Sequence, residues 1–140
     1  MSVSLGGRLE TIDARECLEL LIAHHIGRLS VVVGDQPLVF PVNYAMLDRQ
    51  VVFRTDPGTK LHAANRRRVA FEIDGIDPRY HDGWSVLVVG TAREERDAVR
   101  LRKFAALPLA PWVSGAKAHW LYIAGGAITG RRITHLVPDE

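Results

Sequence analysis

The spacing of apolar residues divides the chain into helices and strands. Between residues 13 and 25 apolar side chains recur at helical spacing, Asp13 and Glu16 have the spacing of a capping box, and Gly27 follows as a terminator, so we predict a first helix there. Short runs rich in β-branched and aromatic residues, bounded by turn residues, predict strands. These strands are expected at residues 28–33, 38–47, 51–54, 69–74, 84–93, 120–123 and 127–133.

Other segments complete the expected organisation. A short helix is expected from Thr59, and an amphipathic helix over residues 96–107 is stopped by Pro108. Residues 75–83 are predicted to form a loop, and the unbroken apolar run 86–89 predicts a strand that is buried on both faces. A length of 140 residues suffices for one core but not for two, so we expect one domain over 1–140, with 1–10 as a flexible N-terminal segment.

The segment over residues 51–64 carries the most informative candidate chemistry. A β-branched strand passes through a Pro-Gly turn into the short helix, and cations, hydroxyl groups and backbone N–H groups all occur at this junction. A phosphate monoester is recognised by this combination. Thr59 is also a candidate N-cap, and Gly58 suits a positive φ or a close approach. The candidate phosphate ligands are Arg54, Thr55, Gly58, Thr59 and Lys60.

A second candidate feature lies in the strand that precedes this junction. Pro41 interrupts an apolar strand, and proline cannot donate to a sheet ladder, so it belongs at an edge or a bulge. A strand opened there leaves backbone N–H and C=O groups available to the rim of a flat heterocycle. Val42 supplies such backbone groups, and Asn43 adds a side-chain donor and acceptor.

In their order along the chain, these motifs resemble the FMN-binding split barrel family, the relatives of pyridoxamine 5'-phosphate oxidase. The resemblance spans about residues 15 to 133. It is carried by Gly27-Arg28-Leu29, Phe40-Pro41-Val42-Asn43-Tyr44, Phe53-Arg54-Thr55 with Gly58-Thr59-Lys60, Trp84-Ser85-Val86, His119-Trp120 and Ile128-Thr129-Gly130-Arg131-Arg132.

The resemblance implies a mainly β fold, a six-stranded antiparallel split β-barrel with short helices, assembled as a homodimer with FMN between the two chains. It places Trp84, Ser85 and Trp120 at the dimer seam near the flavin, and gives Trp112 a weaker claim to such a place. The implied cofactor-binding set is therefore Val42, Asn43, Arg54, Thr55, Gly58, Thr59, Lys60, Trp84, Ser85 and Trp120.

The implied activity is that of a flavin-dependent oxidoreductase that transfers electrons or hydride to a small molecule. Because the flavin performs the redox chemistry, no catalytic residue of the protein is assigned. After Arg132 the chain lacks the C-terminal Arg-Leu-His-Asp-Arg segment of true pyridoxamine phosphate oxidases, so oxidation of that vitamin is not expected. A deazaflavin coenzyme or haem stays open as an alternative cofactor, and a sensor or carrier that binds a cofactor without catalysis stays open as an alternative function.

The composition limits the classes of partner and ligand that are expected. The net charge is only +2, from 18 Lys and Arg against 16 Asp and Glu, which gives little support to nucleic-acid binding. The cluster 66–68 of three arginines is interpreted as structural, at the end of the short helix. No apolar stretch is long enough to span a membrane, and we expect a cytoplasmic protein. Cys17 is predicted to be a core residue, the histidines to be structural, and no metal site is expected.

Overall fold

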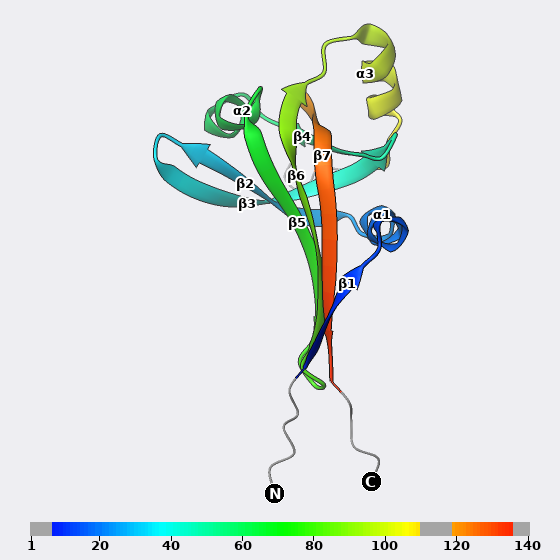
Figure 1. Ribbon diagram of the computed structural model, residues 1–140. Helices are drawn as coiled ribbons and strands as arrows, with labels where there is room; N and C mark the ends of the chain where they lie inside the picture. Colours follow the sequence, from blue (N-terminus) through cyan, green and yellow to red (C-terminus); the bar gives the residue numbers. More distant parts are fainter. Residues whose placement is uncertain (1–6, 110–118, 136–140) are drawn as a thin grey trace, which may run out of the picture.

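The computed structural model describes residues 7–109 and 119–135 (Figure 1). Seven strands and three helices follow one another in the part of the chain so described. In chain order they are β1 (Arg8–Ile12), α1 (Ala14–Ala23), β2 (Ile26–Val33), β3 (Gln36–Leu47), β4 (Gln50–Thr55), α2 (Thr59–Ala64), β5 (Arg68–Asp77), β6 (Asp82–Glu94), α3 (Ala98–Ala105) and β7 (His119–Thr134).

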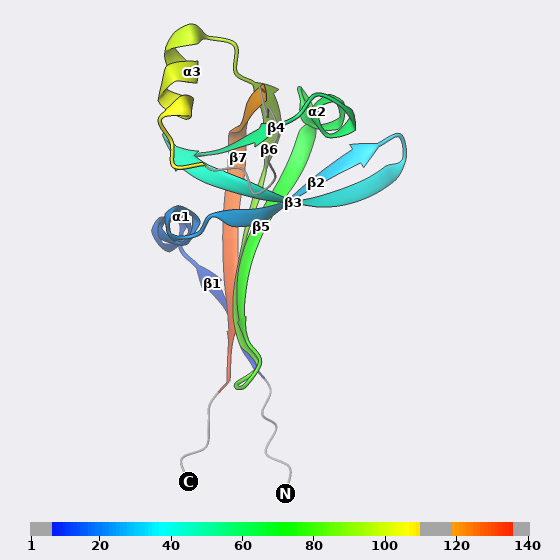
Figure 2. The same ribbon diagram turned by 180° about the vertical axis from the view of Figure 1, so that it is seen from behind.

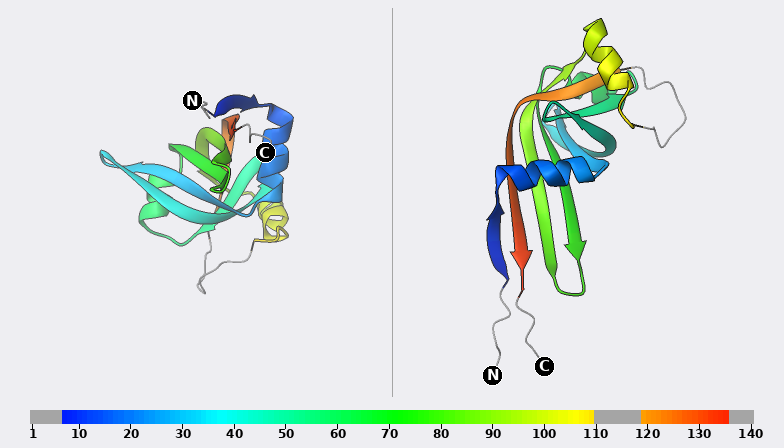
Figure 3. Two further views of the ribbon diagram at one scale, coloured as in Figure 1. Left: turned by 90° about the horizontal axis from the view of Figure 1, so that it is seen from below. Right: turned by 90° about the vertical axis from the view of Figure 1, so that its right-hand side faces the viewer.

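All seven strands belong to one antiparallel sheet in the order β1-β7-β4-β3-β2-β5-β6. An additional pairing of β6 with β7 closes this sheet into a barrel, which is seen from below in the left view of Figure 3. The six strands β2 to β7 form the closed circuit, so the expected six-stranded split barrel is confirmed. The two runs predicted at 120–123 and 127–133 are one continuous strand, β7, with a register shift opposite 89–91 on β6.

The seventh strand is a correction to the sequence prediction. Residues 8–10 were expected within a flexible segment, but they belong to β1, which pairs with the last part of β7 from Arg8↔Thr134 to Ile12↔Gly130. Four of the five β1 residues are exposed, and only Ile12 is buried. Backbone pairing holds this strand in place. Because it does not depend on buried side chains, the sequence of β1 shows almost no hydrophobic pattern.

Residues 75–83 also differ from the loop that was predicted. β5 continues to Asp77 and β6 begins at Asp82, so the two strands form a long ribbon that reaches away from the barrel, downward in Figures 1 and 2. Gly75 is needed inside this ribbon, because a Cβ there would lie 2.5 Å from Nε1 of Trp84. Glycine therefore marks close packing at this position rather than a turn.

The run 86–89 on β6 alternates in burial. Val86 and Val88 are buried in the barrel, whereas Leu87 and Val89 on the other face are only half-buried. The expected burial on both faces is therefore wrong for the single chain. The continuous apolar run means that the outer face of β6 is itself apolar.

Helix α1 begins where the sequence predicted, because the Asp13 carboxylate accepts a hydrogen bond of 2.8 Å from the backbone N–H of Glu16. The Glu16 side chain does not complete a capping box; it pairs with Arg132 of β7. Cys17 and Leu21 are fully buried against the barrel, which confirms Cys17 as a core residue. The right view of Figure 3 shows α1 lying across the strands.

Helix α3 packs on the outer face of β4 and β7 at the other end of the barrel. It begins at Asp97, which caps the N–H of Arg100, and its Phe104 is fully buried beside the rings of Trp120 and Tyr122. The barrel interior holds the large apolar side chains from β2 to β7 and from α1 and α2. Its largest fully buried members are Tyr44, Phe53, Phe71, Leu21, Leu29, Ile73 and Leu121.

Candidate functional site

Strand β3 changes its partner between Asn43 and Tyr44. Its first part pairs with β2, from Val33↔Gln36 to Ile26↔Asn43, and its last part pairs with β4, from Tyr44↔Phe53 to Leu47↔Gln50. Beyond Tyr44↔Phe53 the β3–β4 ladder ends, so the sheet opens between β3 and the C-terminal end of β4. Proline at position 41, two residues before the change, contributes no N–H to either ladder.

Val42 and Asn43 lie at this opening. The Val42 side chain is buried, with 6% exposed, and its backbone N–H and C=O face β2, because the Tyr44 N–H two residues later donates to the His25 carbonyl on that side. Asn43 is half-buried, and alternation along the strand places its side chain on the face opposite to Val42. Continuing the β3–β4 register places these two residues across the opening from Thr55 and Arg54.

The loop from β4 to α2 forms the other side of the opening. Gly58 occupies the position before the helix with φ of 137° and ψ of −155°, a conformation open essentially to glycine alone. A Cβ at Gly58 would meet nothing within 4 Å, so the backbone conformation and not space requires glycine there. Thr59 is the first residue of α2 and is exposed; its expected role as N-cap is wrong, because Gly58 holds that position without a side-chain cap.

The two cations of the predicted phosphate site lie on aromatic rings from two different strands. Cζ of Arg54 lies 4.8 Å from the centre of the Trp120 ring on β7, and Nζ of Lys60 lies 5.4 Å from the centre of the Phe40 ring on β3. Both cations are half-buried. A cation held on a ring loses part of its freedom before any anion arrives, which lowers the entropy cost of binding.

Thr55 is placed less favourably for its predicted role than Thr59. Its side chain is 2% exposed, and its hydroxyl donates a hydrogen bond of 3.2 Å to the Asp56 carbonyl. The hydroxyl hydrogen is thus used locally, and only the oxygen can still accept from a ligand.

The structure does not bring Trp84 and Ser85 to the other predicted ligands within one chain. Trp84 pairs with Arg132 and Ser85 with Arg131, near the C-terminal end of β7, whereas Arg54 pairs with Trp120 near its start. At about 3.3 Å per residue, positions 120 and 132 are roughly 40 Å apart along the strand. The Trp84 ring instead packs on His24, with 4.9 Å between ring centres.

A polar cluster beside the opening has no counterpart among the sequence predictions. His119, opposite Thr55, has its Nδ1 2.7 Å from Oε2 of Glu94, and Arg96 donates to Oε1 of the same carboxylate. The Glu94 backbone N–H donates to the Asn65 side chain over 2.9 Å. These residues come from separate segments whose pairing only the folded sheet reveals, so no local pattern could have identified them.

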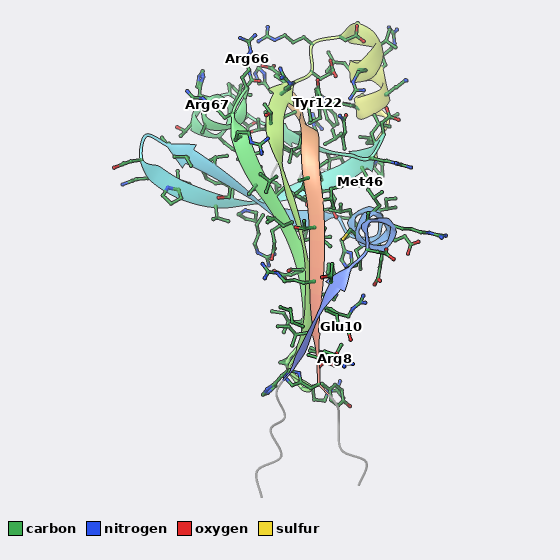
Figure 4. The ribbon with its side chains drawn as sticks, viewed as in Figure 1. Arg8, Glu10, Met46, Arg66, Arg67 and Tyr122 are labelled. Carbon is green, nitrogen blue, oxygen red and sulfur yellow. The ribbon has the colours of Figure 1, made fainter. Side chains whose placement is uncertain are left out.

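The arginine cluster also lies near this end of the barrel. Figure 4 shows Arg66 and Arg67 beside α2, at the end of the molecule that carries the opening. Arg67 and Arg68 line a cavity together with Gly58 and Thr59, so the cluster does more than follow the end of the helix. Trp112, the weaker candidate from the sequence, lies outside the described residues.

Two further findings concern metals and membranes. Within residues 7–109 and 119–135, no group of three or more His, Cys, Asp or Glu side chains is arranged to hold a metal ion. Over the same ranges, no helix has both the length and the apolar character that crossing a membrane would demand.

Comparisons with known proteins agree with this geometry. A family model described as pyridoxamine 5'-phosphate oxidase matches residues 13–132. The uncharacterized protein Rv0080 of Mycobacterium tuberculosis is 34% identical over 128 residues, which cover 87% of this chain and 84% of that protein.

Solved structures give the same result. The FAD binding protein from Mycobacterium smegmatis is 39% identical with a TM-score of 0.77, over 88% of this chain and 98% of that one. A FAD-binding protein from Mesorhizobium loti is 26% identical with a TM-score of 0.71, over 89% and 97% of the two chains. The sequence match over residues 13–132 and the shared split barrel lead to one conclusion: this chain belongs to the pyridoxamine 5'-phosphate oxidase family.

Proposed function

We propose that this chain binds a flavin between two copies of itself and uses it to transfer electrons or hydride to a small molecule. The observation that carries the proposal is the opening where β3 leaves β4, with Val42 and Asn43 on one side and the Arg54–Lys60 segment on the other. A flavin needs a phosphate site at one end and hydrogen-bonding groups at the edge of its ring system, and this opening offers both.

The Arg54–Lys60 segment suits the phosphate that both FMN and FAD carry on the ribityl chain. Lys60 supplies an ammonium group, Arg54 a guanidinium group, and exposed Thr59 a hydroxyl beside the backbone turn at Gly58. Phosphate oxygens accept strong hydrogen bonds from such charged donors. FMN, the cofactor predicted from the sequence, and FAD are equally served by this set.

The β3 side of the opening suits the edge of the ring system. Beyond Tyr44↔Phe53 the backbone N–H and C=O of Asn43 face the opening and are outside any described ladder, because the Tyr44 N–H and, by alternation, the backbone groups of Val42 face β2. The Asn43 amide adds both a donor and an acceptor. Groups of this kind hold a flat heterocycle in one orientation. When bound, the flavin would supply the redox chemistry; the residues of this chain bind it, orient it and exclude water.

A second copy is required if Trp84 and Ser85 are to reach the same flavin. Within one chain they lie at the far end of β7 from Arg54 and Trp120, so only the partner's β6 could bring them to the site. The half-exposed apolar side chains Leu87 and Val89 on the outer face of β6 give a dimer interface something to bury. The homodimer, the small-molecule substrate and the cytoplasmic location remain parts of this proposal.

The test combines spectroscopy, titration and mass measurement on the purified chain. The absorbance spectrum distinguishes flavin, deazaflavin and haem by their colours. Apoprotein should bind FMN saturably and riboflavin at least about tenfold more weakly, because riboflavin lacks the phosphate. Light scattering should give the mass of two chains, and reduction of the bound flavin by a donor, followed by reoxidation by an acceptor, should show turnover. No saturable binding of either FMN or FAD contradicts the proposal.

A further inference from the structure

A pocket of about 400 Å³ lies between the C-terminal end of α1, the end of the β3–β4 hairpin and the segment that follows α3. Met46, which Figure 4 labels between α1 and α3, is part of its lining. Small-molecule sites usually have volumes of roughly 300 to 1,000 Å³. The pocket therefore has room for a small molecule.

Strand β3 places this pocket beside the proposed flavin site. Ala45 belongs to the pocket lining, and alternation along the strand puts its side chain on the same face as that of Asn43. Two residues of a strand span about 7 Å, and the step from 43 to 45 leads away from Arg54 on β4. A molecule in the pocket would therefore adjoin the ring end of the flavin and not its phosphate end.

Most of the lining is apolar. From α1 come Leu18, which is half-buried, and Ile22, which is 64% exposed. Leu107 and Pro108 line the pocket from the segment after α3. Exposed apolar side chains around a pocket favour a ligand with an apolar body, because binding removes both surfaces from water.

The polar part of the lining favours an anionic group. Its one carboxylate among the described residues, that of Asp48, has the Arg100 guanidinium at 3.8 Å. Arg49, the next residue, takes part in no ion pair within the described part of the chain. His24 donates from Nδ1 to the Leu20 carbonyl over 2.7 Å, so only its Nε2 can serve a ligand. The Arg49 guanidinium is thus the lining group best suited to bind a carboxylate.

We propose that this pocket binds the substrate of the flavin site, and that the substrate is a small apolar molecule with one carboxylate group. The apolar body lies against Ile22 and Met46, and the carboxylate contacts Arg49. This inference rests on the proposed function, because it takes the flavin ring to lie beside Asn43. Occupation of the pocket is nevertheless measurable without any redox reaction.

Calorimetric titration with two apolar carboxylates of different shape, cinnamate and octanoate, provides the test. At least one of them should bind saturably to the protein loaded with oxidised flavin, about tenfold more tightly than its neutral amide, the effect of one charge-assisted hydrogen bond. Arg49→Gln should remove this preference and leave flavin affinity unchanged. Arg102→Gln is the matched control, because it removes a cation from the last turn of α3 that does not line the pocket; it should preserve the preference.

The apolar lining supplies an independent variant. Ile22→Asp should weaken binding of the carboxylate at least about tenfold, because it replaces an apolar contact by a like charge. Val99→Asp is its control, since Val99 is also exposed on a helix, at 54%, but lies outside the pocket. Both positions are exposed, so neither variant should disturb folding.

The outcomes separate this inference from the proposed function. No saturable binding of either carboxylate, equal affinities for acid and amide, or affinities that Arg49→Gln and Ile22→Asp leave unchanged overturn the inference and leave flavin binding intact. Binding of the carboxylate to apoprotein alone, with loss when flavin is added, assigns the pocket to the flavin ring and also overturns it. Absence of saturable binding by both FMN and FAD removes the proposed function itself, and with it the role of the pocket as a substrate site.

Discussion

The Arg54 guanidinium stacks over the Trp120 ring, directly across the β4–β7 ladder, with 4.8 Å from Cζ to the ring centre. The ring in turn packs against Phe104 of α3, so the position of this cation depends on a helix that follows it by more than forty residues. The orientation of Arg54 is therefore a tertiary property, although the residue itself was identified from its neighbours in the sequence.

Replacing the Trp120 ring should show that it affects FMN affinity separately from its effect on the stability of the fold. Trp120→Leu is expected to lower the free energy of unfolding by about 1–2 kcal/mol and to weaken FMN binding about fivefold, because Arg54 loses its support. Tyr122→Leu is the control, since Tyr122 also packs on Phe104 but lies two residues away from Arg54's partner. It should lower stability to a similar extent with FMN affinity unchanged. Equal effects of both variants on affinity would show that Trp120 acts only through folding.

Removal of the Lys60 ammonium should affect both flavins alike. Lys60→Ala is expected to weaken FMN and FAD binding by about 1.5 to 3 kcal/mol, the scale of a charge-assisted hydrogen bond, as measured by fluorescence titration. Lys103→Ala removes a cation from the last turn of α3 and should change neither affinity. Unaltered binding by Lys60→Ala would exclude this residue from the phosphate site.

Mixed dimers test whether two chains build one site. Lys60→Ala and Trp84→Leu should each reduce flavin binding when present in both chains. A heterodimer with one substitution in each chain should bind one flavin tightly, because one of its two sites then receives an intact Lys60 and an intact Trp84. Isothermal titration of the purified heterodimer measures this stoichiometry. A value near zero would mean that both residues serve the site of their own chain.

The conformation of Gly58 leads to a prediction about stability. Gly58→Ala should lower the free energy of unfolding by about 2 kcal/mol, because φ of 137° is strained for any residue with a Cβ. Gly34→Ala should cost less, about 1 kcal/mol, since φ of 64° lies in the left-handed helical region. An added Cβ meets no atom within 4 Å at either position, so urea unfolding of the pair compares backbone strain alone. A smaller loss at position 58 than at 34 would contradict the geometry.

Stability should fall in alkaline solution. Burial raises the pKa of Tyr44 above its usual value of 10.0, and burial likewise raises the pKa of Cys17. The unfolded chain then releases these protons at lower pH than the folded chain, so stability is fully present below pH of about 9 and decreases as pH rises through the folded values. Unfolding experiments between pH 8 and 11 should show this slope.

Tyr44→Phe measures how much Tyr44 contributes to the decrease of stability with rising pH. The variant should show a shallower decrease above pH of about 10, and at neutral pH it should lose about 1–3 kcal/mol, because the Leu21 carbonyl no longer receives its hydrogen bond of 2.6 Å. Exposed Tyr80→Phe should leave the profile unchanged. An identical alkaline slope in Tyr44→Phe and the unchanged protein would show that the tyrosine does not contribute.

The sequence allowed most of the barrel to be predicted, because its inward strands carry strong apolar runs and Asp13 is a local capping signal. It could not reveal β1, whose residues are mostly exposed and whose partner lies at the other end of the chain. The ribbon at 75–83 was missed because its Gly and Pro residues are typical of loops, whereas Gly75 in fact makes room for Trp84.

The candidate site was likewise predicted from the sequence only in part. The Arg54–Lys60 segment is contiguous, so its residue types alone predicted its chemistry. The arginine cluster 66–68 was interpreted as the end of a helix, because the cavity that Arg67 lines is completed by residues 32 and 33, more than thirty positions earlier. Such a juxtaposition depends on how the hairpin folds back beneath α2, and no local pattern records it.

The β2–β3 hairpin is tied to β5 by only three residue pairs, from Arg28↔Glu72 to Ser30↔Ala70. Beyond Ser30 it continues as a two-stranded ribbon, and ribbons of two strands are marginally stable on their own. Val32 and Val33, which line the cavity beside α2, lie in this ribbon. This side of the cavity therefore rests on the pairing of β2 with β3 alone, so a substitution at the hairpin turn would change the cavity before it changed the barrel.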